Sequence, residues 1–169
     1  MWFFRRRSGS PQKRPPISAQ LAALIRVHMD SADDDDVRIA TAIAGLFATI
    51  AYADREYAAE ERTRIRDDLT RMQTLPSAGV NAVCALLDEH IVELSASNTQ
   101  SYTRDLCELL DVESRREVLT VLVDLAAADG TISHSESNLL RRVTNALALT
   151  PDDYLAAQAA HRDRLPTLK

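Results

Sequence analysis

Two acidic residues flank a short turn in the stretch AAADGTISHSES, where their spacing is suited to cation binding. Asp129 directly precedes Gly130, and Glu136 follows near the end of the same stretch. The second half of an EF-hand calcium loop has the same order, with an oxygen ligand, then glycine, then a glutamate at its last position. Ser133 and the main-chain carbonyl of Thr131 occupy two more ligand positions of such a loop. These residues are therefore a candidate site for Ca²⁺ or a similar divalent cation.

The first half of the loop lacks ligands, and a second interpretation explains the same residues. Leu125 and Ala127 stand where an EF-hand has its first two side-chain oxygens, so few of the six to eight oxygens that Ca²⁺ prefers remain. Ser133 and Glu136 also form the pattern S-x-x-E of a capping box, in which each side chain binds a free amide at the start of a helix. In this interpretation, the side chain of Asp129 accepts hydrogen bonds from main-chain amides of the turn. Cation binding and helix capping both remain open at this point.

The rest of the chain predicts helices that surround a central one. From Ile17 onward, apolar residues recur at intervals of three and four, and no segment alternates with period two. The segment Val37–Ala53 carries no charge after Arg38, which is typical of a helix buried on all sides. Thr150 and Pro151 are suited to begin a last helix. We expect an all-α, single-domain bundle of seven to eight helices.

The candidate loop has a counterpart earlier in the chain. When Leu46–Leu69 is placed over Val121–Thr144, an Ala-Asp pair, an apolar turn residue and a glutamate coincide. Asp54 and Glu61 are the counterparts of Asp129 and Glu136. This agreement predicts an internal duplication of a helix-turn-helix unit. If the two units are related by a rough two-fold axis, their four carboxylates could share one ion.

The paired motif resembles the TerB-like tellurite-resistance domain, a type also found at the N-terminus of membrane-anchored DjlA co-chaperones. The similarity extends from Val37 to the end of the chain. It implies a seven-helix type of fold without catalysis and a role in stress response or tellurite resistance, often near the membrane. It also implies a metal-binding acidic site at Asp54, Glu61, Asp129 and Glu136. The first copy departs from the pattern, because Arg55 replaces the glycine and Ala58 replaces the serine.

The first sixteen residues differ from the remainder in composition. They contain five basic residues and no acidic one, with prolines, so residues 1–16 are predicted to be a disordered arm before an all-helical TerB-like domain of residues 17–169. Aromatic rings beside arginines are suited to peripheral contact with an anionic membrane. The residues predicted to make this contact are Trp2, Phe3, Phe4, Arg5, Arg6 and Arg7.

The composition argues against several classes of function. Without the five basic residues of the arm, fifteen basic and twenty-five acidic residues remain, a net charge of −10 that would repel nucleic acid. No pattern of a nucleophile elbow, a phosphate loop or a paired-histidine zinc site occurs in the sequence. We therefore expect a protein that is not an enzyme and has no certain cofactor.

The expected function is that of an interaction module with an unidentified protein partner, whose acidic turns either bind that partner or hold a divalent cation. The alternative is a low-affinity sensor or buffer of divalent metal that uses the paired Asp/Glu loops. The expected location is the cytoplasm, with peripheral contact at the inner face of the membrane.

Overall fold

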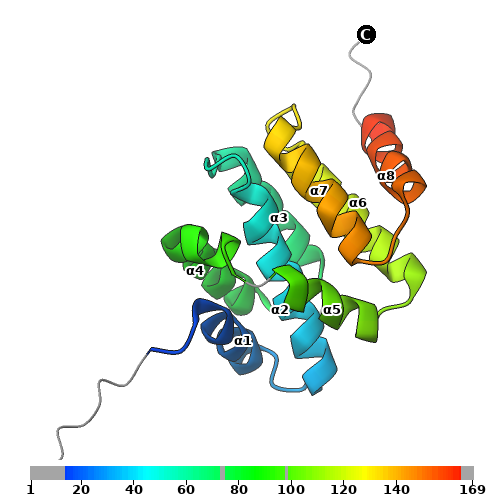
Figure 1. The fold of residues 1–169 in the computed structure, drawn as a ribbon. Helices are drawn as coiled ribbons and strands as arrows, with labels where there is room; N and C mark the ends of the chain where they lie inside the picture. Colours follow the sequence, from blue (N-terminus) through cyan, green and yellow to red (C-terminus); the bar gives the residue numbers. More distant parts are fainter. Residues whose placement is uncertain (1–13, 73–74, 98, 165–169) are drawn as a thin grey trace, which may run out of the picture.

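The computed structural model describes residues 14–72, 75–97 and 99–164, and within these ranges it contains eight helices and no strand (Figure 1). The prediction of an all-helical bundle is thereby confirmed. Of the predicted arm, only residues 14–16 are described, so the six residues predicted to contact a membrane lie outside the described part. The helices are α1 Ile17–His28, α2 Asp34–Ala51, α3 Ala59–Arg71, α4 Ser77–Ser95, α5 Thr99–Leu109, α6 Val112–Ala126, α7 His134–Ala146 and α8 Pro151–Arg164.

Helix α2 is the centre of the bundle, as its uninterrupted apolar sequence predicts. It begins three residues earlier than expected, because Asp33 caps it by accepting a hydrogen bond from the Asp36 amide at 2.9 Å. The acidic residues of its first turn then stabilise the positive end of the helix dipole. Helix α2 packs against α1, α3, α4, α5, α6 and α7, and Phe47 is among its fully buried side chains. None of the helices within the described ranges is long and apolar enough to cross a membrane.

The predicted duplication is present in the backbone. Helices α2 and α6 end at Ala51 and Ala126, and α3 and α7 begin at Ala59 and His134, so both pairs keep the same offset in the sequence. Figure 1 shows the turn between α2 and α3 and the turn between α6 and α7 at the same end of the molecule. We refer to this end, formed by residues 52–61 and 127–136, as the acidic end. The repeat therefore brings the two predicted loops to one side.

A glycine allows α5 to lie close against α2. A Cβ atom built on Gly45 would lie 2.3 Å from Cε2 of Tyr102, a buried residue of α5. Such a distance is far below van der Waals contact, so the ring would have to move. The Tyr102 hydroxyl is also 3.2 Å from Oγ of Ser97, which fixes the ring from its other side.

We expect Gly45→Ala to lower the free energy of unfolding by about 1–3 kcal/mol, because the added methyl group overpacks the contact between α2 and α5. Urea unfolding followed by circular dichroism measures this change. Asn145→Ala, at an exposed position of α7, serves as a control and should change the value by less than about 0.5 kcal/mol. Equal stabilities of Gly45→Ala and the wild type would contradict the close packing.

Candidate functional site: the acidic end

The two aspartates close the two turns in the same way. Oδ1 of Asp54 accepts a hydrogen bond from the Glu56 amide at 2.9 Å, and Oδ1 of Asp129 accepts one from the Thr131 amide at 3.0 Å. The residue after each aspartate has a positive φ, 70° at Arg55 and 101° at Gly130. Each aspartate therefore uses one carboxylate oxygen to hold a left-handed turn together.

The two glutamates cap the helices that follow. Oε2 of Glu61 accepts from the Ala58 amide at 2.8 Å, and Oε2 of Glu136 accepts from the Ser133 amide at 2.7 Å. In the second copy, the Glu136 amide also donates to Oγ of Ser133 at 3.2 Å, which completes a capping box. Ala58 has no side-chain acceptor, so the first copy has only the glutamate half of this arrangement. The capping interpretation of these residues is confirmed.

Both capping glutamates are buried although they carry a negative charge when ionised. Glu61 is 6% exposed and Glu136 is 4% exposed. Burial raises the pKa of Glu61 from its ordinary 4.5 to about 7, against the opposing effect of the Ala58 amide, and the charges of Glu136, Asp54 and Asp129 raise it further. Burial also raises the pKa of Glu136, the Ser133 hydrogen bonds lower it, and Asp54 and Asp129 again raise it. The carboxylates of the two turns therefore repel one another.

The cation-binding interpretation depends on the same residues and stays a prediction. Carboxylate and carbonyl oxygens suit Ca²⁺, but Oε2 of Glu61 and of Glu136 already accept from cap amides. Among the residues that the structure describes, no group of three or more His, Cys, Asp or Glu side chains is placed so that it could hold a metal ion. The predicted ligands are Asp54, Glu61, Asp129, Glu136, Ser133 and the Thr131 carbonyl. Because the side chains are not placed around one point, joint binding by them would require the turns to move.

A buried ionic network, which the sequence analysis missed, joins α3, α6 and α8. Nε of Arg64 lies 2.7 Å from Oδ2 of Asp68, and Nη2 of Arg64 lies 3.2 Å from Oδ2 of Asp124. Nδ1 of His161 lies 2.8 Å from Oδ1 of Asp124, whose side chain is only 2% exposed. The one local signal is that Asp124 interrupts the apolar run VLVDLAA. The network holds α8 against the bundle. Because the partners of Asp124 come from distant segments of the chain, no local pattern in the sequence predicts it.

The fold and this end together define a class of protein: an all-helical domain built on a duplicated helix-turn-helix, with acidic turns of equal shape. A family model for the tellurite resistance protein TerB matches residues 40–159, and the chain belongs to this family. Comparison with curated proteins and with solved structures gave no match. The predicted TerB-like resemblance is thereby confirmed, and the matched residues include both acidic turns.

We expect Glu61→Gln to make the stability of the protein less dependent on pH. Between 4.5 and about 7, folded protein retains a proton on Glu61 that the unfolded chain has released. The stability that this group contributes is thus complete below its unfolded pKa and is lost as the pH rises through about 7. Glutamine can still accept from the Ala58 amide but carries no charge, so the variant should be more stable than the wild type at about pH 8.

Urea unfolding at several pH values between about 5 and 8 measures this effect. The wild type should lose stability as the pH rises, and Glu61→Gln should show a shallower slope. Some slope should remain, because burial also raises the pKa values of Glu136 and Asp68. Glu60→Gln, an exposed neighbour on α3, should keep the slope of the wild type. Equal slopes in Glu61→Gln and the wild type would contradict the raised pKa of Glu61.

Proposed function

We propose that this TerB-family domain is a non-catalytic interaction module and that its acidic end binds a cationic segment of a partner protein. The observation that carries the proposal is the gathering of four carboxylates at this end: burial raises the pKa of Glu61 to about 7, and the charges of Glu136, Asp54 and Asp129 raise it further. A protein that brings carboxylates together in this way loses stability at neutral pH. A bound cation would relieve the repulsion, so its affinity would include that gain.

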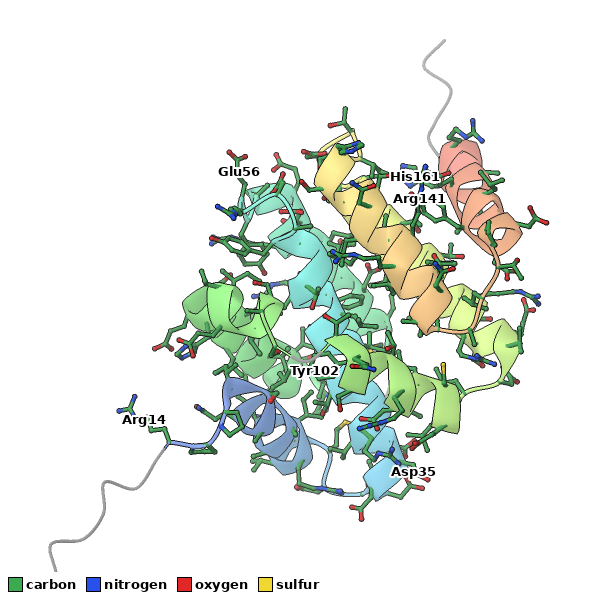
Figure 2. The ribbon with its side chains drawn as sticks, viewed as in Figure 1. Arg14, Asp35, Glu56, Tyr102, Arg141 and His161 are labelled. Carbon is green, nitrogen blue, oxygen red and sulfur yellow. The ribbon has the colours of Figure 1, made fainter. Side chains whose placement is uncertain are left out.

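The exposure of the acidic residues supports a surface function. Asp54, Glu56, Glu60 and Asp129 are exposed, whereas Glu61 and Glu136 lie buried beneath them. The buried pair thus sets the shape and potential of this end, and the exposed groups are available to lysine or arginine side chains. Figure 2 shows Glu56 at this end of the molecule and Asp35 at the opposite end.

The absence of a preformed metal-ligand group within the described ranges favours a basic peptide over a metal ion. Peptide ammonium and guanidinium groups can pair with separate exposed carboxylates and need no single coordination centre. The family is generally non-catalytic, which is compatible with a binding role. We also propose a setting in stress response or tellurite resistance, which the family suggests. The alternative role is that of a low-affinity metal sensor or buffer, and the next experiment distinguishes it from peptide binding.

Calorimetric titration of the full chain with an oligolysine peptide, and separately with Ca²⁺, Mn²⁺ and Zn²⁺, distinguishes the two roles. We expect oligolysine to bind with an affinity that falls as salt is added, because surface charges are screened. The double variant Asp54→Asn, Asp129→Asn should weaken this binding about fivefold or more. Asp35→Asn, which removes one charge at the opposite end, should bind as the wild type does.

Different results of this titration would favour the metal sensor or overturn the proposal. Saturable Ca²⁺ binding that the double variant abolishes, together with silence toward oligolysine, would favour the metal sensor instead. No response to the peptide or to any of the ions would overturn the acidic end as a binding surface.

We further propose that residues 1–7 place the domain at an anionic membrane surface, through Trp2, Phe3, Phe4 and the three arginines that follow. Each arginine near such a surface contributes about 1 kcal/mol. The full chain should therefore co-sediment with vesicles that contain anionic lipid, and a chain that lacks residues 1–16 should not. Equal sedimentation of the two chains, or binding to neutral vesicles alone, would rule out this contact.

A further inference from the structure

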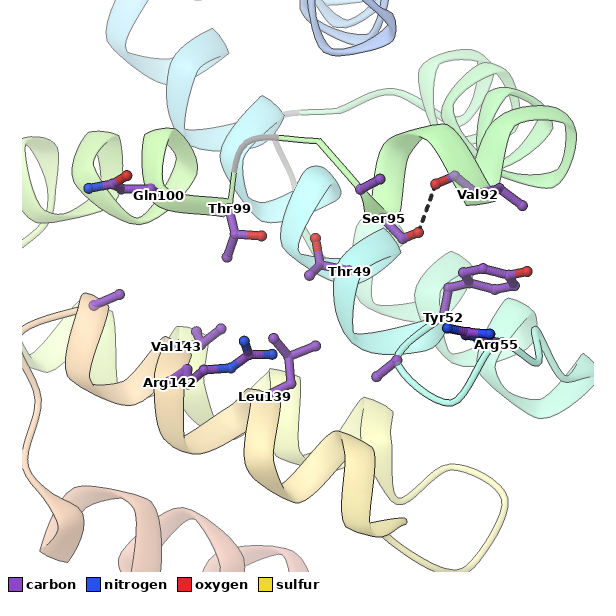
Figure 3. A pocket seen from close by; sticks show the side chains of 13 residues that line it. Thr49, Tyr52, Arg55, Val92, Ser95, Thr99, Gln100, Leu139, Arg142 and Val143 are labelled. Atoms are coloured by element: carbon purple, nitrogen blue, oxygen red, sulfur yellow. Dashed lines mark hydrogen bonds between the residues drawn. The ribbon is translucent and has the colours of Figure 1, made fainter.

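A cleft beside the acidic end lies between the end of α2, the end of α4, the start of α5 and α7. The cleft has a volume of about 610 Å³, which lies within the range of pockets that hold organic ligands. Ala53, Leu139 and Val143 give it apolar walls. Figure 3 shows Leu139, Arg142 and Val143 on α7 facing the end of α2, where Thr49 lies.

The charge of this cleft is opposite to that of the chain. The protein has a net charge of −5, yet the residues that line the cleft include Arg55 and Arg142 and no aspartate or glutamate. Within the described ranges, neither of these two guanidinium groups makes a hydrogen bond or an ion pair. Other arginines of the chain do pair with acids: Arg26, Arg38, Arg62, Arg64, Arg71 and Arg116.

Other lining residues of the cleft also carry polar groups. Tyr52 contributes a hydroxyl and Gln100 a side-chain amide. Gln100 belongs to the first turn of α5, whose positive dipole end favours an anion, but the ends of α2 and α4 bring negative dipole ends to the same cleft. The helix dipoles thus oppose one another, and the positive character of the cleft comes from its arginines.

The backbone at Arg55 is unfavourable for an arginine. Its φ of 70° lies in the left-handed region, where a side chain costs about 1 kcal/mol relative to glycine, and the equivalent position of the second copy is Gly130. No packing of the turn requires this side chain, because Arg55 is exposed. What the arginine adds is a guanidinium group at the cleft. A strained position that supplies a charged group to a cavity is a feature of binding sites.

The duplication provides a comparison inside the molecule. A smaller cleft, of about 490 Å³, lies at the equivalent place between α6 and α3. Its lining contains Asp124 and Asp67 where the first cleft has Thr49 and Arg142. The same backbone therefore accommodates either charge, and the positive charge of the first cleft is a property of its own residues and not a requirement of the fold.

We propose that the cleft between α2, α4, α5 and α7 binds a small organic anion with an apolar body and a carboxylate or phosphate head. Arg142 pairs with the head, since a guanidinium binds either oxyanion through two parallel hydrogen bonds. Arg55 lies beside Tyr52 at another part of the cleft and adds positive charge there (Figure 3). The alkyl or ring body lies against Leu139, Val143 and Ala53. This site adjoins the acidic end, to which Tyr52, Ala53 and Arg55 belong, but no carboxylate of that end lines it.

NMR titration of the full chain tests the proposal with four probes. Octanoate and octyl phosphate combine an apolar body with an anionic head, octan-1-ol has only the body, and inorganic phosphate has only the head. We expect saturable shifts at Leu139 and Val143 with the two amphiphilic anions, and binding at least about tenfold weaker with the other two probes. A difference between octanoate and octyl phosphate shows which head the cleft prefers, and either preference supports the proposal.

Three variants separate a role in binding from a role in folding. Arg142→Gln should weaken octyl phosphate binding about tenfold, and Arg55→Gly should weaken it by a smaller factor. Arg55→Gly should unfold at a urea concentration no lower than the wild type, because glycine suits the positive φ. Arg141→Gln removes the same charge from the adjacent exposed position of α7, which does not line the cleft, and should bind normally.

Several outcomes would overturn the proposal. If octan-1-ol bound as tightly as octanoate, the cleft would recognise only the apolar body and not the anionic head. If Arg142→Gln bound octyl phosphate as the wild type does, Arg142 would have no part in recognising the head. If neither octanoate nor octyl phosphate caused shifts at millimolar concentration, the cleft would not be a site for such anions. The variant Asp54→Asn, Asp129→Asn should bind octyl phosphate normally, so a failure here is distinguishable from a failure of the acidic end.

Discussion

Two buried carboxylates, Glu61 and Glu136, hold the acidic end of this molecule in shape. Each accepts the main-chain amide of the residue at the helix start, and each is almost wholly removed from water. A buried charge is costly unless hydrogen bonds satisfy it, so the caps are needed to keep these groups in place. The turns that they fix then set the positions of Asp54 and Asp129 at the surface. The acidic end is thus built on groups that destabilise one another.

The duplication explains why this destabilising arrangement occurs at all. Once one helix-turn-helix unit has an aspartate and a glutamate at its turn, a two-fold arrangement of two units brings four carboxylates to the same end. The sides of the bundle differ between the two copies. The cleft beside α7 has Arg55 and Arg142, while its counterpart beside α3 has Asp67 and Asp124. One backbone plan therefore presents a shared acidic end and two clefts of different charge.

Local signals in the sequence predicted much of the fold and the geometry of the turns. The period of apolar residues predicted the helices, and the uncharged run after Arg38 predicted the central position of α2. The pattern S-x-x-E at Ser133 and Glu136 predicted a capping box, because the two partners are only three residues apart. The start of α2 was wrong by three residues, since Asp33 caps the helix and its other acids join the first turn.

The sequence by itself therefore determined the helices, the capping box of Ser133 and Glu136, and the repeat that relates Asp54 to Asp129. Contacts between distant segments were decided only by the tertiary structure. The ion pairs of Asp124 with Arg64 and His161, and the cleft shared by Arg55 and Arg142, join residues from different helices. A local pattern depends on backbone geometry that repeats in every helix, whereas these contacts depend on how the helices pack, and that packing is the sum of many weak apolar contacts.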